Sequence, residues 1–211
     1  MKTLCTGLAF GLAAALTASS ASAAITFFNS RPAFEAALGT FITDGYNSPP
    51  YGAGFQIYSD AVMSAFLGET DYQTTGFSNL NIKDANGRYC AGCNGSFRLS
   101  FTTTSVGSAN GVYGAGLDIT VNSTSLPYHA FITFGDNTTQ DVLLPTTPGF
   151  WGVTADQEIK SIHFGLANGG TTTNGSFQID NLTIGSALVP APGALALLGA
   201  AGLMARRRRR A

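Results

Sequence analysis

The stretch Glu158–Leu166, EIKSIHFGL, decides the fold class because its polar and apolar side chains alternate. A period of two residues is typical of a β-strand that buries one face. The set expected to face the core is Lys160, Ile162, Phe164 and Leu166. The set expected to face outward is Ile159, Ser161, His163 and Gly165.

The same period recurs elsewhere in the chain. SFRLSF, residues 96–101, places apolar side chains at every second position. YHAFITFGDNTTQDVLL, residues 128–144, predicts a hairpin that turns at Gly135-Asp136-Asn137. In SFQIDNLTIG, residues 176–185, the apolar parity slips at Asp180-Asn181, which indicates a β-bulge or bend.

The stretch ITFFNSRPAFEAALG, residues 25–39, predicts a strand over Ile25–Phe28 and then one short helix. Ser30 is the expected N-cap and Gly39 the expected C-cap, with Phe34, Ala37 and Leu38 on the apolar face. Many short strands with Gly-rich turns and one short helix predict a mainly β, jelly-roll-like β-sandwich over residues 24–185.

Charge is distributed unevenly along the 211 residues. Five of the 11 basic residues are Arg206–Arg210 and one is Lys2, which leaves five basic residues in the middle of the chain against all 12 acidic ones. The predicted domain therefore carries a net charge of 5 − 12 = −7. Because an acidic domain repels a phosphate backbone, nucleic acid is not an expected partner.

The N-terminus has the pattern of a secretory signal peptide over residues 1–23. Lys2 gives the positive end, Leu4–Leu16 the apolar run, and Ala21-Ser22-Ala23 the small-residue cleavage motif. Cleavage between Ala23 and Ala24 would remove Cys5 with the signal. The chain is therefore expected to be exported through the inner membrane.

The C-terminus, VPAPGALALLGAAGLMARRRRRA over residues 189–211, is a marginal membrane segment. An apolar helix over residues 193–205 would span roughly 20 Å, against about 30 Å of hydrocarbon. The arginine cluster at 206–210 resists translocation and would stay in the cytoplasm. A permanent tail anchor and a transient membrane insertion that ends in cleavage are both compatible with this pattern.

Residues 186–211 resemble the PEP-CTERM sorting signal of Gram-negative bacteria, which has a Pro-Glu-Pro motif, an apolar helix and an arginine cluster. Ala191 departs from it, since it stands where the acidic residue is usual, and the sortase subtype stays open. The matching positions are Val189, Pro190, Ala191, Pro192, Arg206, Arg207, Arg208, Arg209 and Arg210.

Three motifs before the tail resemble the domain common in such proteins. They are the F-x-x-R-x-x-F motif of Phe28, Arg31 and Phe34, the GFWGV strand at 149–153 and IDNLTIG at 179–185. The resemblance implies processing by an exosortase-type membrane enzyme and delivery to the cell surface, outer membrane or extracellular matrix. It also implies a sandwich similar to carbohydrate-binding modules, with polysaccharide as a possible partner.

Cys90 and Cys93, in YCAGCNGS, are expected to form a local disulfide in an oxidising compartment. A zinc site would need two further ligands, and a redox C-x-x-C would need a helix that the sequence does not predict. No cofactor is expected apart from a possible structural calcium ion. The calcium candidates are Asp136, Asp141, Asp156 and Asp180, for which solvated loop positions are the alternative.

The sequence contains no recognisable set of catalytic residues. His129 and His163 suggest catalysis with Asp136 or Asp156, but hydrogen-bonded imidazoles on strand faces are the simpler interpretation. Exposed aromatic rings can stack on sugars, and the tyrosine candidates, some of which are expected in the core, are Tyr46, Tyr51, Tyr58, Tyr72 and Tyr89. The expected function is non-enzymatic surface or matrix binding; a glycan-acting hydrolase with unidentified carboxylates is the alternative.

Overall fold

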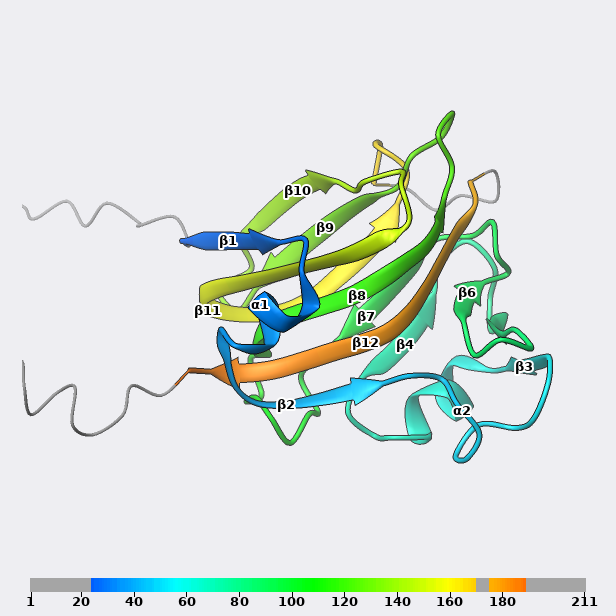
Figure 1. The fold of residues 1–211 in the computed structure, drawn as a ribbon, viewed down its shortest axis with the longest axis horizontal. Helices are drawn as coiled ribbons and strands as arrows, with labels where there is room; N and C mark the ends of the chain where they lie inside the picture. The colour runs from blue at the N-terminus through cyan, green and yellow to red at the C-terminus, as the bar shows by residue number, and fades with distance from the viewer. Residues whose placement is uncertain (1–23, 170–174, 189–211) are drawn as a thin grey trace, which may run out of the picture.

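The computed structural model describes residues 24–169 and 175–188, and over these residues the chain is mainly β (Figure 1). The helices are α1 (Arg31–Glu35) and α2 (Asp60–Ala65). The strands are β1 (Ile25–Phe28), β2 (Leu38–Asp44), β3 (Gln56–Tyr58), β4 (Asp71–Thr74), β5 (Asn81–Lys83), β6 (Tyr89–Ala91), β7 (Phe97–Ser100), β8 (Val112–Asn122), β9 (His129–Phe134), β10 (Thr139–Leu143), β11 (Gly149–Gly165) and β12 (Phe177–Ala187).

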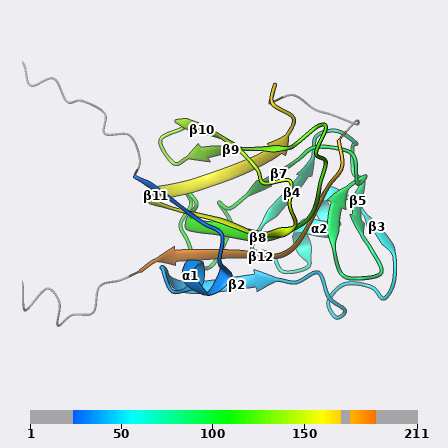
Figure 2. The ribbon, with the colours of Figure 1, turned by 45° about the horizontal axis from the view of Figure 1, so that its top comes forward.

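Strand β11 organises the sheet because its two ends have different neighbours. Its first part lies between β1 and β8, and its last part lies between β9 and β7, all antiparallel. The first layer contains β1, the first part of β11, β8, β12 and β2. The second layer contains β10, β9, the last part of β11, β7 and β4. This arrangement, visible in Figure 2, is consistent with the predicted β-sandwich.

The core lies between the two layers. Trp151 and Phe177 come from the first layer and Phe164 from the second, and all three side chains are buried. The ring centroid of Phe164 is 6.3 Å from that of Trp151 and 5.4 Å from that of Phe177. The burial of Phe97, Leu99 and Phe101 confirms the alternation predicted for SFRLSF.

Helix α1 packs against the outer face of the first layer through Phe34, which is fully buried. The strand positions beneath it are glycines. A Cβ on Gly114, Gly116 or Gly152 would come within 3.3 Å of the Phe34 ring. The absence of side chains at these positions therefore makes room for the helix.

The predicted end of α1 was wrong. The helix begins after Ser30 as expected, with Pro32 in its first turn, but it ends at Glu35 with Ala36 as the C-cap. Gly39 belongs to β2, where a Cβ would lie 2.5 Å from the carbonyl oxygen of Ala187. Because Gly39 has no side chain, β2 can approach β12 closely at this position.

The prediction of a single helix was also wrong, because the described residues contain a second one. Helix α2 follows Ser59, whose hydroxyl accepts a hydrogen bond from the Val62 amide at 3.3 Å. Asp60 lies in the first turn, and Met63 buries its side chain in the core. Ser59 and Asp60 are ordinary N-terminal helix signals.

Register shifts between paired strands adjust which side chains reach the core. The register shift predicted at Asp180-Asn181 is confirmed, and Asn181 has a φ of 48°. A second shift lies between Ile159 and Ser161, and it was not predicted. Because of it, Ile159 is fully buried while Lys160 is partly exposed, which reverses the expectation for these two residues.

The predicted signal helix (1–23) and C-terminal apolar helix (193–205) lie outside the described residues. Neither helix within the described ranges has the length and hydropathy needed to cross a membrane.

Candidate functional site

The outer face of the second layer brings together polar and aromatic side chains from five strands. Antiparallel register aligns Asp141 of β10, Phe131 of β9, His163 of β11, Arg98 of β7 and Gln73 of β4 across the sheet. We call this set the aromatic row. Its neighbours along the strands, such as Leu99 and Ile162, point into the core, so the row points outward.

A second row runs parallel to the first, two residues along each strand. It consists of Thr139, Thr133, Ser161, Ser100 and Asp71, which are again partners in register. We call this set the hydroxyl row. Four of its five members carry hydroxyl groups, which both donate and accept hydrogen bonds.

An open cleft of about 470 Å³ lies over these two rows. Its lining includes Arg98, Phe131, Thr133, Lys160, Ser161 and His163. The cleft therefore combines an aromatic ring, hydroxyl groups and two cationic groups on a rigid sheet.

Phe131, in the aromatic row, is held in place by neighbouring rings. Its ring centroid is 5.9 Å from that of His129, with 14° between the planes, and 6.0 Å from that of His163. A Cβ on Gly169 would lie 3.6 Å from the same ring. Phe131 remains partly exposed although these neighbours fix its position.

Both histidines have hydrogen-bond partners on this face. Nε2 of His163 is 3.0 Å from Oγ1 of Thr75, and Nδ1 of His129 is 2.7 Å from Oδ1 of Asp141. Burial, and secondarily the charge of Arg98, lowers the pKa of His163 to about 4, so this imidazole is neutral at pH 7. These contacts confirm the strand-face interpretation of both imidazoles.

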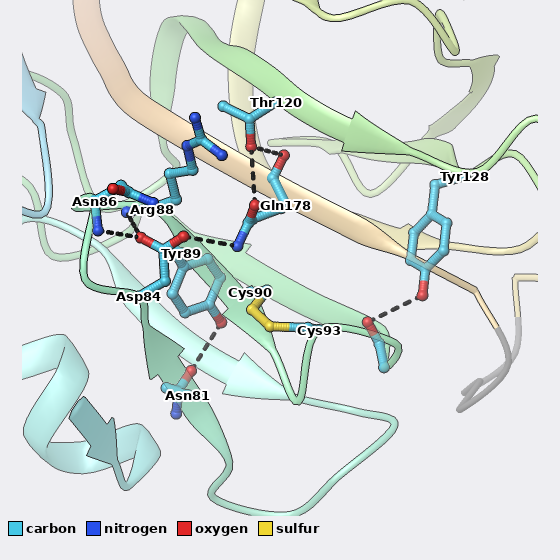
Figure 3. The surroundings of a disulfide bond; sticks show 11 residues. Asn81, Asp84, Asn86, Arg88, Tyr89, Cys90, Cys93, Thr120, Tyr128 and Gln178 are labelled. Carbon is cyan, nitrogen blue, oxygen red and sulfur yellow. Dashed lines mark hydrogen bonds between the residues drawn. A yellow bond between two sulfur atoms is a disulfide. The ribbon is translucent and has the colours of Figure 1, made fainter. Parts of the chain in front are cut away.

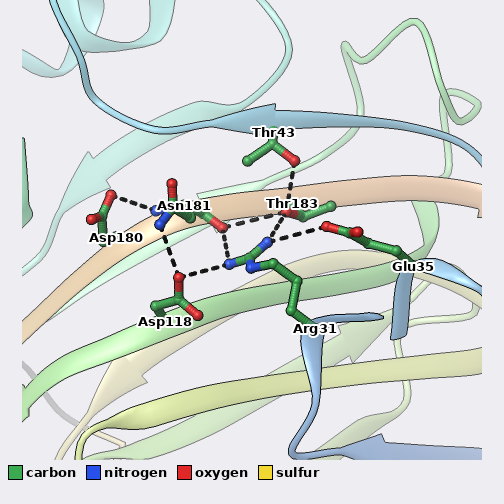
Figure 4. A network of polar contacts seen from close by, with 7 residues as sticks. All are labelled: Arg31, Glu35, Thr43, Asp118, Asp180, Asn181 and Thr183. Carbon is green, nitrogen blue, oxygen red and sulfur yellow. Dashed lines mark hydrogen bonds and ion pairs between the residues drawn. The ribbon is translucent and has the colours of Figure 1, made fainter. Parts of the chain in front are cut away.

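A separate polar network lies on the outer face of the first layer and centres on Arg31 (Figure 4). Nη2 of Arg31 is 3.0 Å from Oδ2 of Asp118 and donates to the carbonyl oxygen of Asn181 at 2.8 Å. Nη1 donates to Oγ1 of Thr183 at 2.6 Å. The guanidinium also lies 4.8 Å from the centroid of the Phe150 ring. Arg31 thus fastens α1 to β8 and β12.

The same network brings two carboxylates close together. Asp118 and Asp180 are register partners on β8 and β12. Oδ2 of Asp118 also accepts from the Asn181 side-chain amide at 2.9 Å. Burial is the main cause that raises the pKa of Asp180, and the charge of Asp118 adds to it. No sequence signal had singled out this pair.

Four of the candidate tyrosines are buried and do not form an exposed platform. Tyr46, Tyr51, Tyr72 and Tyr89 have at most 4% of their surface exposed. The hydroxyl groups of Tyr51 and Tyr72 donate to the carboxylate of Asp44, whose pKa is raised by its own burial. These four rings therefore belong to the core, as Trp151 also does.

The sulfur atoms of Cys90 and Cys93 lie at disulfide-bonding distance, with their Cα atoms 4.6 Å apart (Figure 3). Gly92 and Cys93 have φ values of 58° and 61°, so the chain turns sharply between β6 and β7. A Cβ on Gly92 would collide with the Phe77 ring. The pair therefore closes a tight turn, as the sequence predicted.

The four calcium candidates each have a hydrogen-bond or ion-pair partner within the protein. Asp136 accepts from the Thr138 hydroxyl group, Asp141 contacts His129, Asp156 accepts from the Ala24 amide, and Asp180 accepts from the Asn181 amide. Within the described ranges no group of three or more acidic, histidine or cysteine side chains is arranged to hold a metal ion. Calcium at these aspartates therefore stays a prediction.

The cleavage residues Ala21 and Ala23 and the sorting motif with its arginine cluster lie outside the described residues, whereas Ala24 is the first residue within them.

No family model matches this chain, and no curated protein or solved structure is significantly similar to it.

Proposed function

We propose that this chain is an exported, non-catalytic β-sandwich that binds polysaccharide through the outer face of its second layer. The observation that carries the proposal is the alignment of Phe131, His163 and Arg98 beside the hydroxyl row. We also propose that the two layers form a jelly-roll-like sandwich similar to carbohydrate-binding modules.

The chemistry of this face suits a sugar chain. The apolar face of a sugar ring can stack on Phe131, which is partly exposed and fixed by its neighbours. Sugar hydroxyl groups need partners that donate and accept, and Thr133, Thr139 and Ser161 supply both. The rigid strands hold these groups in place, which reduces the entropy lost on binding.

Location rests on the two ends of the sequence. The signal pattern at residues 1–23 supports export, and the sorting pattern at residues 189–211 supports transient membrane insertion followed by processing. The proposed processing partner is an exosortase-type membrane enzyme, and the proposed destination is the cell surface, outer membrane or extracellular matrix. Mass spectrometry of the surface fraction should find an N-terminus at Ala24 and no peptide from the arginine cluster; predominance of intact tails would contradict processing.

Binding can be tested with Phe131→Ala on a polysaccharide panel, measured by affinity electrophoresis and calorimetry. Loss of one stacking ring should weaken binding about tenfold. The matched control is Phe55→Ala, which removes an aromatic ring that is 57% exposed but not part of the cleft. Unchanged binding by folded Phe131→Ala, or no binding to any polysaccharide, would reject the proposal.

A glycan-acting hydrolase is the second candidate, and the Asp118–Asp180 pair is the observation that favours it. Paired carboxylates in different environments can act as acid and base in glycoside hydrolysis. Here Asp180 has a raised pKa while Asp118 contacts Arg31. Release of reducing ends that is abolished by Asp180→Asn but not by Asp136→Asn, an exposed control, would support this function.

A further inference from the structure

The cleft over the second layer differs in charge from the rest of the domain. Only five basic residues lie in residues 24–188, against 12 acidic ones. Two of those five, Arg98 and Lys160, line the cleft, and none of the residues lining it is acidic. Cationic groups therefore gather on one face of a protein domain that is otherwise acidic.

The other three basic side chains are engaged within the protein. Arg31 contacts the carboxylates of Asp118 and Glu35. Lys83 is 3% exposed and donates to the carbonyl oxygens of Gly52 and Gly54. Arg88 lies near enough to Asp180 to lower the pKa of that carboxyl group.

Arg98 and Lys160 have neutral partners. Nη1 of Arg98 is 3.4 Å from Oε1 of Gln73, and Nζ of Lys160 donates to Oδ1 of Asn137 at 3.1 Å. Neither takes part in an ion pair with the residues that the structure describes. An amide partner orients a cation but does not cancel its charge, so both charges remain available to a ligand.

We infer that the cleft takes an anionic polysaccharide of the uronic acid class, with its carboxylates on Arg98 and Lys160 and a sugar ring on Phe131. This inference rests on the proposed polysaccharide-binding function. Arg98 is the next member of the aromatic row beyond His163, so a ring stacked on Phe131 and a carboxylate at Arg98 belong to one bound chain. Arginine binds carboxylates through two parallel hydrogen bonds.

The two acidic members of the rows lie on the edge strands of the layer. Asp141 on β10 is occupied by His129, and Asp71 on β4 lies 3.5 Å from the Thr103 hydroxyl group. They flank the cationic centre and would repel a polyanion that bound out of register. The charge pattern across the strands therefore favours one placement of the ligand.

The test uses the full chain with two matched probes, polygalacturonate and the same polymer with its carboxylates methyl-esterified. Binding is measured by calorimetry at about 0.05 M and about 0.5 M salt, since screening weakens exposed charge interactions. Polygalacturonate should bind at least about tenfold more tightly than the ester, because hydrogen bonds to a charged group are the strong ones. The difference should shrink at the higher salt concentration.

Three charge variants make the assignment specific. Arg98→Gln and Lys160→Gln should each weaken polygalacturonate binding about fivefold to tenfold and leave binding of the ester unchanged. Arg88→Gln removes the same charge near Asp180, outside the cleft lining, and should have no effect. Two results would contradict the anionic ligand but not the polysaccharide-binding function. One is equal affinity for both probes, and the other is tighter binding of the ester that is lost in Phe131→Ala. Absence of binding to both probes and to the neutral panel would overturn both.

Discussion

Nη2 of Arg31, on α1, lies 3.0 Å from Oδ2 of Asp118, on β8. The two residues are 87 positions apart in the sequence, so this contact fixes the N-terminal helix against the centre of the first layer. The adjoining bonds to Thr183 and Asn181 extend the attachment to β12.

Substitution of Arg31 by Ala should therefore lower the free energy of unfolding. The loss should be about 2 kcal/mol, less than for a fully buried pair because both side chains are about a quarter to a third exposed. Urea denaturation monitored by Trp151 fluorescence measures it. Arg98→Ala, at an exposed position, is the control and should cost less than about 0.5 kcal/mol. Equal stability of the two variants would show that the contact contributes nothing.

The glycines under Phe34 give a second prediction. A Cβ on Gly116 would lie 2.7 Å from Cζ of Phe150 and 3.0 Å from Cε1 of Phe34, so Gly116→Ala should destabilise the fold by about 1–3 kcal/mol. Phe34→Ala should cost about 3–4 kcal/mol through the lost burial. Gly135→Ala is the matched control, because its nearest contact would be an ordinary 3.4 Å. Thermal unfolding should leave that variant close to the wild type, and a similar loss in both glycine variants would contradict the packing argument.

His163 should make stability depend on pH. Its pKa is lowered to about 4 in the folded protein against an ordinary 6.5, so between these values the unfolded state binds more protons. The contribution is fully present above pH 6.5 and is lost as pH falls toward 4. Since the imidazole is only partly buried, solvent reduces the effect and we expect about 1–2 kcal/mol.

The measurement compares the wild type with His163→Gln at pH 7 and at pH 4. The Gln variant cannot titrate, and its amide can still hydrogen-bond to Thr75. The free energy of unfolding of this variant should therefore fall less than that of the wild type between pH 7 and pH 4. Contributions of the other titrating groups are common to both proteins and cancel in the comparison. Parallel pH profiles for the two proteins would be inconsistent with a lowered His163 pKa.

Cys90 and Cys93 give a fourth prediction. In the chain-entropy model a disulfide that closes so short a loop adds only about 2 kcal/mol. The double variant Cys90→Ser, Cys93→Ser should therefore fold with a modestly lower midpoint in urea. Mass spectrometry of the mature protein without reductant should find no thiol that can be alkylated. Two free thiols would contradict the disulfide.

Local patterns predicted the strands well. The alternation in SFRLSF, the turn at Asp136-Asn137 and the parity slip at Asp180-Asn181 each depend on neighbours in the sequence, and each was confirmed. The bulge beside Ile159 was missed because one strict alternation was extended through Lys160 and Ser161, two consecutive polar residues that mark the slip. Gly39 was misassigned because a helix cap and a close approach between strands both call for glycine.

The candidate site depended on information that no local pattern contains. Phe131, His163 and Arg98 belong to three strands, and their alignment follows from the order of the strands in the sheet. Alternation predicts that each of these side chains faces outward, but it does not predict which residues of other strands lie beside it. The tyrosines were misjudged for a different reason. Their hydroxyl groups suggested exposed side chains, whereas inside the protein Asp44 accepts hydrogen bonds from such groups and the rings pack against one another.

The length of β11 has a mechanical consequence. Because one continuous strand of 17 residues belongs to both layers, neither layer can detach without breaking the backbone hydrogen bonds of the other. The two halves of the sandwich should therefore unfold as a single cooperative unit. Amide hydrogens near Val153 and near Ile162 should exchange with deuterium at the same slow, globally limited rate, although they report on opposite sides of the core.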